Sequence, residues 1–261
     1  MNELLLIKLT ATPLLILFCM FGARRWGAFA AGLLAGFPTI SGPISLLLTL
    51  ERGAAFSAQA AYHTLWGIEA CGASVLAYAW LAYAGVPWYA VLTISLATFF
   101  LAGWGALFCS PALGVLILIT ALMPCLILLF LPKFAPDEGK SARMPGWMIP
   151  LQMAGGIFLV YGISEAAPRL GAGWSGLLAF FPVLICAIVP AVHVSCGVAS
   201  AVGTIRGFMT GWFGGIAFTV CVALGVEHLS VPMCYTLASV SALAASGVAV
   251  SLRSTFTKKR K

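Results

Sequence analysis

Charged side chains are scarce in this sequence, and their scarcity excludes most kinds of soluble protein. Only 8% of the 261 residues are charged, against about one quarter in a typical soluble domain. Apolar residues make up 62% of the chain, and the mean hydropathy is +1.06. Because a membrane helix takes about 20 residues, the chain has room for roughly nine crossings and for no sizeable soluble domain.

Motifs that identify common enzyme classes are missing as well. The sequence has no P-loop, no G-x-G-x-x-G motif after a strand, no HExxH and no GxSxG. Its only aspartate is Asp137, which excludes a pair of buried catalytic aspartates. The eight cysteines form no CxxC pair and lie in or beside apolar runs, where cysteine acts as a small apolar residue. We therefore expect no enzyme activity, no disulfide, no metal site and no cofactor.

The net charge of +7 lies mostly between the apolar runs. Five of the fourteen basic residues stand in the tail after residue 252, and most others fall in short loops. Basic loops of this kind set membrane topology, and a basic tail is also attracted to anionic lipid. We expect membrane lipid as a partner and no nucleic acid.

The apolar runs predict an all-α, polytopic membrane protein with about nine transmembrane helices. Between Val86 and Pro132 the 47 residues would span about 70 Å as one helix, so we predict two crossings joined by a tight turn at Cys109-Ser110-Pro111. Residues 132–146, with three prolines and five charges, predict an exposed linker. The predicted spans are 4–22, 27–49, 57–83, 87–108, 112–131, 147–163, 171–192, 199–224 and 231–251.

One part of the sequence occurs twice. Residues 25–38 return 144 positions later as residues 169–182, with nine of fourteen pairs identical. Gly53 then pairs with Gly197, and after one inserted residue Val86-Pro87 pairs with Val231-Pro232. Self-similarity at one spacing indicates a structural unit that occurs twice.

Each unit holds four predicted spans, and one span is left over between them. Five crossings separate equivalent points, so we predict two four-helix repeats of inverted topology joined by one linking helix. The predicted domains are residues 1–110, a linking helix and cytoplasmic loop over 111–144, and residues 145–261. With nine spans, one face carries ten basic residues and the other three. The positive-inside rule makes the ten-residue face cytoplasmic, with the N-terminus outside and the C-terminus inside.

The stretch AAGLLAGFPTISGPISLLLTLERG resembles the GlpM-like family of small bacterial inner-membrane proteins. The resemblance rests on Ala31-Gly32-Leu33 with Phe37-Pro38-Thr39, and more loosely on Ser175-Gly176-Leu177 with Phe181-Pro182-Val183. It implies one four-helix unit in each half and a place in the bacterial inner membrane. Val183 departs from the pattern because it lacks the threonine hydroxyl. A fused, inverted pair is also the plan of drug/metabolite transporters, an analogy of architecture alone.

Prolines interrupt the second helix of each unit. Pro38 lies near the middle of one predicted span, with Thr39 and Ser41 just beyond it, and Pro182 lies near the middle of the other. Proline removes an amide donor and displaces a carbonyl group, so each break exposes backbone polar groups at mid-membrane depth. In inverted repeats such breaks frame a substrate site. A kink that only shapes packing is the alternative.

Glu69 lies near the middle of a predicted span. Placing a carboxylate at that depth in the membrane costs about 3 kcal/mol of free energy, so a charged residue there by default marks a functional site. Apolar surroundings favour the neutral carboxyl group, which makes Glu69 a candidate proton carrier. Tyr62 and Trp66 share its helix face. A neutral acid making one interhelical hydrogen bond is the alternative. His63 lies about 120° away and either lines an access path or bonds a neighbouring helix.

Arg206 is the charged residue of the equivalent helix, at the position that corresponds to Tyr62. Its side chain either extends to the cytoplasmic surface, forms an ion pair with Glu69, or binds an anionic substrate through two hydrogen bonds from its planar guanidinium group. Lys8 and Gln152 are also equivalent positions, each polar inside a first helix. They mark either a shared polar spot or capping at the membrane surface.

These features favour a small proton-coupled secondary transporter or exporter that works by alternating access between the two repeats. Its solute is small, and an anion is one option for it. The alternative is a non-transporting scaffold or regulatory component of an envelope, lipid or uptake system. A small molecule or ion is the expected ligand in the first case. A homo-oligomer or a membrane partner protein is compatible with both.

The topology argument makes a direct prediction. Reporter proteins fused after residues 85, 140 and 261 should all be cytoplasmic, because an odd number of predicted crossings separates each site from an external N-terminus. A green fluorescent protein fusion should fluoresce at all three sites, and an alkaline phosphatase fusion should be inactive at all three. One periplasmic result among them contradicts the predicted topology.

Overall fold

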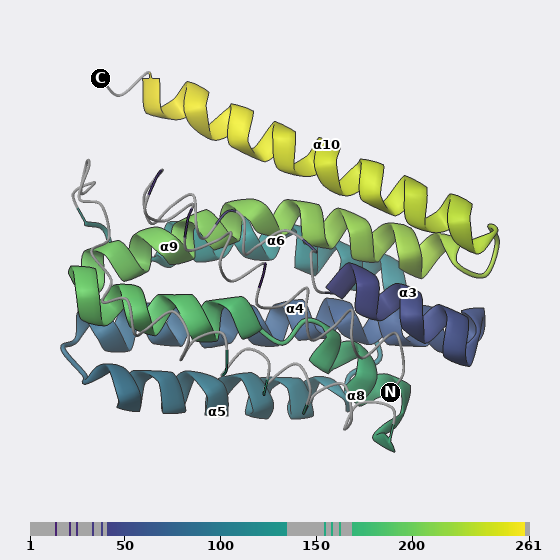
Figure 1. Cartoon of the computed structure of the whole chain (residues 1–261), viewed down its shortest axis with the longest axis horizontal. Coiled ribbons are helices and arrows are strands. Elements are labelled where there is room, and N and C mark those ends of the chain that lie inside the picture. The colour runs from purple at the N-terminus through teal and green to yellow at the C-terminus, as the bar shows by residue number, and fades with distance from the viewer. Residues whose placement is uncertain are drawn as a thin grey trace.

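The structure is a computed structural model that describes residues 41–134 and 169–258 continuously. It also describes eight single residues, Leu14, Phe21, Arg25, Leu33, Pro38, Ala154, Phe158 and Gly162. Seven helices and no strand are found in the described part of the chain (Figure 1). They are α3 (Ser41–Arg52), α4 (Ala54–Tyr83), α5 (Trp88–Ala106), α6 (Leu113–Phe130), α8 (Gly171–Ala179), α9 (Val183–Gly225) and α10 (Val231–Lys258).

Five of these helices are long and apolar enough to cross a membrane, as in a multi-pass integral membrane protein. They are α4, α5, α6, residues 186–225 of α9 and residues 231–251 of α10. The predicted all-α membrane fold is thus confirmed, including the two separate helices between Val86 and Pro132. Of the remaining predicted spans, 4–22, 147–163 and most of 27–49 lie outside the described residues.

The predicted division between 171–192 and 199–224 is confirmed, because Gly197 has a non-helical backbone that separates two helical parts of α9. The prediction of one continuous helix over 171–192 is wrong, because α8 ends at Ala179 and α9 begins at Val183. Phe180 to Pro182 break the first helix completely, because proline has no amide hydrogen and disfavours a helical residue before it. At nine residues, α8 is too short to cross a membrane alone.

Backbone geometry recurs at the two ends of the 144-residue spacing. Gly53 has φ 87° and ψ 171°, and Gly197 has φ 81° and ψ 173°, a conformation that favours glycine. The Pro38 carbonyl accepts a hydrogen bond from the Gly42 amide (3.1 Å), and the Pro182 carbonyl accepts one from the Cys186 amide (2.8 Å). In both places a short helix lies after a proline, a glycine bends the chain, and a long helix follows.

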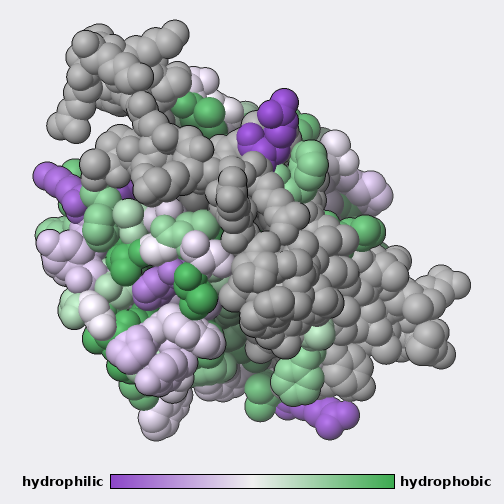
Figure 2. All heavy atoms as spheres, turned by 60° about the vertical axis from the view of Figure 1, so that its left-hand side comes forward, coloured by the Kyte–Doolittle hydropathy of each residue, from purple (hydrophilic) through white to green (hydrophobic). Residues whose placement is uncertain are grey.

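Helix α4 lies at the centre of the bundle, where it contacts α3, α5, α6, α8 and α9 (Figure 1). Fully buried side chains fill the core, among them Leu65 and Ile68 of α4 and Met209 and Trp212 of α9. In contrast, α6 and α10 expose rows of large apolar side chains, and apolar residues reach the surface in Figure 2. Such surfaces suit contact with lipid tails, which are as apolar as leucine.

Exposed aromatic side chains mark both ends of α5. Trp88 and Tyr89 stand at its start, and Trp104 and Phe108 stand at and just beyond its end. Trp88 and Trp104 are about 24 Å apart along the helix at 1.5 Å per residue, close to the thickness of a hydrocarbon core of about 30 Å. Tryptophan and tyrosine are enriched at membrane–water boundaries, so α5 has the length and the ends of a membrane crossing.

Small residues let α8 approach α4 until their backbones touch. A Cβ at Gly176 of α8 would collide with the Ala60 carbonyl oxygen of α4, and one at Gly67 would lie 2.6 Å from the Leu177 carbonyl oxygen. The Thr64 hydroxyl of α4 donates to the Gly176 carbonyl at 3.0 Å. Close crossings of this type replace the hydrophobic effect as the force between membrane helices.

Replacing Gly176 by Ala should therefore destabilise the protein by about 3 kcal/mol, the upper end of overpacking effects, because backbone atoms cannot move aside as a side chain can. Thermal unfolding of the purified protein, followed by tryptophan fluorescence, measures the change. Gly203→Ala in α9 is the matched control, since a Cβ there meets nothing within 4 Å. Equal unfolding temperatures for the two variants would contradict the crossing.

Candidate functional site

One face of α4 follows α6 along its whole length. The Tyr62 hydroxyl donates to the Pro111 carbonyl just before α6 (2.8 Å), and the Trp80 indole N–H donates to the Phe130 carbonyl at its end (3.0 Å). The two helices therefore run in the same direction. Both bonds use polar tips of otherwise apolar side chains to satisfy carbonyl groups near the ends of α6.

Glu69 lies on this face, halfway along α4, and its carboxyl group interacts with Thr120 in the middle of α6. Thr120 is fully buried, and its hydroxyl donates to the Leu116 carbonyl at 2.9 Å. With its hydrogen used there, Thr120 offers Glu69 only a lone pair. Only the neutral carboxyl group has a hydrogen to place on that lone pair. The Glu69 Oε1 atom is buried and has no hydrogen-bond partner among the residues that the structure describes.

Two further residues that the sequence singled out have unsatisfied polar atoms nearby on α4. In the described part of the chain, the buried Trp66 Nε1 and His63 Nδ1 atoms have no hydrogen-bond partners. Trp66 is one turn from Glu69, whereas His63 packs edge-on against the Tyr62 ring at 5.2 Å and lies beside Gly173 of α8. Buried groups without partners are rare, so three of them within two turns of one helix distinguish this part of α4.

Arg206 contacts the other end of α6. Its guanidinium donates to the Pro132 carbonyl at 2.6 Å and to the Leu131 carbonyl at 3.4 Å. The last carbonyl groups of a helix have no partner within the helix, and a cation is favoured at this negative end of the dipole. Thr120, beside Glu69, is about 16 Å away along α6 at 1.5 Å per residue. The structure thus places Arg206 at the end of α6 rather than beside Glu69.

Tyr62 and Arg206, which are equivalent positions 144 residues apart, thus bind carbonyl groups at opposite ends of α6. The second part of α9 accordingly runs antiparallel to α4. Packing agrees, since Ala61 near the start of α4 lies in one cluster with Phe218 and Val222 near the end of α9.

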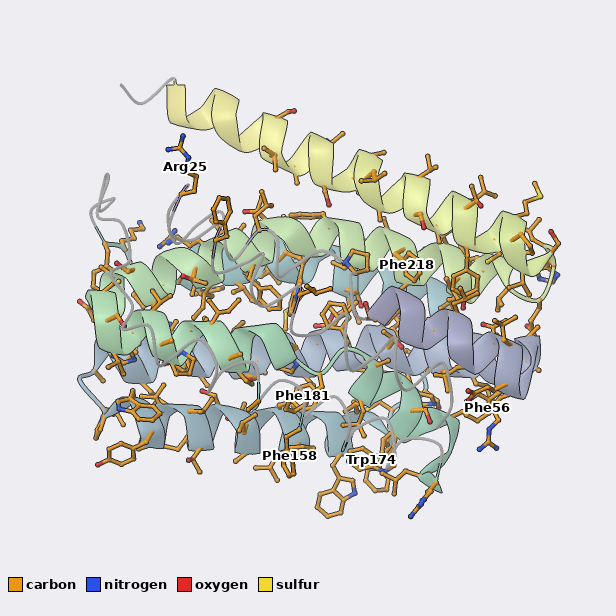
Figure 3. All side chains as sticks on the ribbon, in the orientation of Figure 1. Arg25, Phe56, Phe158, Trp174, Phe181 and Phe218 are labelled. Atoms are coloured by element: carbon orange, nitrogen blue, oxygen red, sulfur yellow. The ribbon has the colours of Figure 1, made fainter. Side chains whose placement is uncertain are left out.

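The break at Pro182 is surrounded by aromatic rings. Phe181, labelled in Figure 3, packs against Phe99 of α5 with ring centres 5.1 Å apart. Phe180 packs against Trp212 of α9 at 5.5 Å. All four side chains are buried. The Pro182 carbonyl is used by the Cys186 amide, so the backbone group next to the break is satisfied within α9.

The corresponding break in the first half is described at fewer positions. Pro38 is buried, and its carbonyl is satisfied by Gly42. Ser41 is half-buried at the start of α3. Three other residues that the sequence indicated lie outside the described residues, namely Thr39, Lys8 and Gln152.

A buried hydroxyl cluster was missed by the sequence analysis. The Tyr235 hydroxyl of α10 lies 2.6 Å from Thr49 Oγ1 and 2.9 Å from Ser45 Oγ, both of α3, and Thr49 also donates to Ser57 of α4 at 2.8 Å. The spacing of Ser45 and Thr49 puts both on one helix face, but no sequence pattern identifies Tyr235 as their partner. The cluster joins three helices and has its hydrogen bonds satisfied internally.

No family model, curated protein or solved structure matches the chain. The resemblance to the GlpM-like family stays a prediction.

The two anchors of α6 can be tested by removing each donor. Tyr62→Phe should cost about 1 kcal/mol of stability, and Arg206→Met about 2 to 3 kcal/mol because the lost bonds involve a charge. Since the two bonds lie at opposite ends of α6, their effects should add within about 0.5 kcal/mol in the double variant. Denaturant unfolding measures all three, with Tyr89→Phe at the exposed start of α5 as the control. Unchanged stability in both single variants would contradict the anchoring.

Proposed function

We propose that this protein is a small proton-coupled secondary transporter of a bacterial inner membrane, built from two inverted four-helix units with α6 between them. The observation that carries the proposal is the carboxyl group of Glu69, which lies halfway along a membrane-spanning helix with one oxygen unpartnered. An ionisable side chain inside the membrane is by default a functional group. The protein moves its solute by alternating access, and Glu69 carries the proton.

The recurring geometry supports two inverted units. Gly53 and Gly197 share one backbone conformation, and equivalent residues Tyr62 and Arg206 bind opposite ends of α6. A pseudo-twofold axis through the middle of α6 relates these contacts, because it exchanges the two ends of the helix. Transporters with inverted repeats place their substrate at the interface between the repeats, near mid-membrane. Thr120 and Glu69 lie at that level.

The hydrogen bonds at Thr120 support a role for Glu69 in proton transfer. Because the Thr120 hydroxyl donates to the Leu116 carbonyl, the neutral acid can donate to the Thr120 oxygen. A carboxylate at mid-membrane costs about 3 kcal/mol unless it gains a partner. Loss of the proton is therefore coupled to the arrival of another group at this site, which is what coupled transport requires.

The predicted orientation puts the N-terminus outside and the C-terminus in the cytoplasm. The Lys133 end of α6, where Arg206 also lies, is then cytoplasmic, in keeping with the excess of basic residues on that face. The resemblance to GlpM-like proteins supports the bacterial inner membrane as the location.

A second candidate function is a non-transporting membrane scaffold or regulatory component, and close packing between α4 and α9 favours it. Leu65, Ile68, Met209 and Trp212 are completely or almost completely buried there. Protein cores packed at this density resist deformation. A carrier has to open part of this interface in each cycle, whereas a scaffold keeps it closed.

Proton flux decides between the two candidates. Purified protein is first screened against a metabolite library for thermal stabilisation, and each stabilising compound is then added to proteoliposomes that contain a pH-sensitive dye. The wild type should take up or release protons on addition of a substrate. Glu69→Gln should abolish this proton flux while the unfolding temperature stays within a few degrees, because the amide is isosteric but cannot ionise.

Glu51→Gln is the matched control, since Glu51 lies exposed in the last turn of α3, and its flux should equal that of the wild type. Full proton-coupled flux in Glu69→Gln would remove Glu69 from the mechanism. A folded wild type that shows no flux with any stabilising compound, and that co-purifies with a membrane partner, would support the scaffold.

A further inference from the structure

We propose that the Glu69 face of α4 binds an organic cation in exchange for a proton. This inference rests on the proposed transport function and specifies the chemical class of its substrate. The ligand class is a substituted ammonium or phosphonium ion with apolar or aromatic groups.

The distribution of charge selects a cation over an anion. In the membrane-spanning ranges of the five apolar helices that the structure describes, only two residues are charged, Glu69 and Arg206. The Arg206 side chain is committed to the Pro132 and Leu131 carbonyls at the end of α6. An anion at the level of Glu69 would therefore meet a carboxyl group and no described cation, whereas a cation would meet its counter-charge.

Aromatic side chains on the same face suit an organic cation. Tyr62 and Trp66 stand seven and three positions before Glu69, which places all three on one side of α4. Both rings are half-buried and pack against the core cluster. A cation over the face of a tryptophan or tyrosine ring is attracted by the ring quadrupole, most strongly for tryptophan. Among the described residues, the Trp66 Nε1 atom has no hydrogen-bond partner, so a hydrogen bond does not fix the orientation of the indole.

The same contacts disfavour a metal ion. Hard cations such as Mg²⁺ and Ca²⁺ take six or more oxygen ligands. On this face, the Glu69 carboxyl and the Thr120 hydroxyl provide three oxygens, and the Tyr62 hydroxyl is directed to the Pro111 carbonyl. A weakly hydrated organic cation needs only one negative charge and adjacent aromatic rings, and both are present on this face of α4.

The exchange balances in charge and protons. In the resting state neutral Glu69 donates its hydrogen to the Thr120 oxygen. When the cation binds, that proton leaves for water and the carboxylate pairs with the cation, so one positive charge replaces another. The nearby groups do not compete for the proton of Glu69. Thr120 of α6 is a hydroxyl that does not take up a proton, and Arg206 of α9 lies at the far end of α6. The His63 side chain is directed toward α8.

A pair of probes with the same shape and opposite charge tests the inference. Tetraphenylphosphonium and tetraphenylborate are titrated separately into the full-length protein in detergent, with tryptophan fluorescence as the binding signal. Tetraphenylphosphonium should bind at least about tenfold more tightly than tetraphenylborate, a difference of about 1.4 kcal/mol. In a weakly buffered solution, its binding should release one proton per protein.

Variants separate the charge from the ring. Glu69→Gln should lose the preference for the cation and the released proton, Glu69→Asp should retain both, and Glu51→Gln should behave as wild type. Trp66→Leu should weaken cation binding by about 2- to 30-fold, while Trp66→Phe should restore part of it through the ring face. A Trp66 variant that binds as tightly as the wild type, with Glu69→Gln also unchanged, overturns the site.

The outcomes also separate this inference from the proposed function. Glu69-dependent proton flux with tighter binding of tetraphenylborate, or with equal binding of both ions, overturns the cation assignment and leaves the transporter intact. Selective cation binding with proton release, but without flux in proteoliposomes, supports the site and contradicts transport. Failure of both probes to bind a folded wild type overturns the inference.

Discussion

Nothing in a hydrocarbon environment can replace a hydrogen bond that the protein fails to make, and this constraint shapes the described structure. Water is absent there, so each carbonyl or amide freed at a helix end or a break needs a partner within the chain. Tyr62, Trp80 and Arg206 provide such partners for the ends of α6. The prolyl carbonyls at the two breaks are satisfied by the helices that follow them. Against this background, an unpartnered carboxyl oxygen in the middle of α4 is an exception with a functional meaning.

Packing between the helices follows from the same environment. Lipid tails do not drive apolar helices together, so close backbone contact and interhelical hydrogen bonds replace the hydrophobic effect. Gly176 and Gly67 bring α8 and α4 into such contact, and Thr64 adds a hydrogen bond across the crossing. The hydroxyl cluster around Tyr235 does the same for α3 and α10. Helices α6 and α10 instead keep large apolar side chains exposed, as helices at a lipid boundary do.

The sequence predicted single helices well and their partners poorly. The ends of α4, α5 and α6 fall within three residues of the predicted spans, because the length of an apolar run is a local property. The break at Pro182 was also predicted, since proline acts on its own neighbours. However, the sequence left Arg206 with three partners to choose from, and the structure places it on the α6 carbonyls. That choice depends on which helix end lies near residue 206, and no local pattern contains this information.

By itself, the sequence determined that the chain belongs in a membrane, that it is helical and that one segment occurs twice. These properties depend on composition, on the length of apolar runs and on repeated residues, all of which are read along the chain. Only the tertiary structure decided that Thr120 faces Glu69, that Tyr62 and Arg206 bind opposite ends of α6, and that aromatic rings enclose the Pro182 break. The physical reason is that each of these contacts joins helices distant in sequence, and their relative height and rotation are fixed by packing.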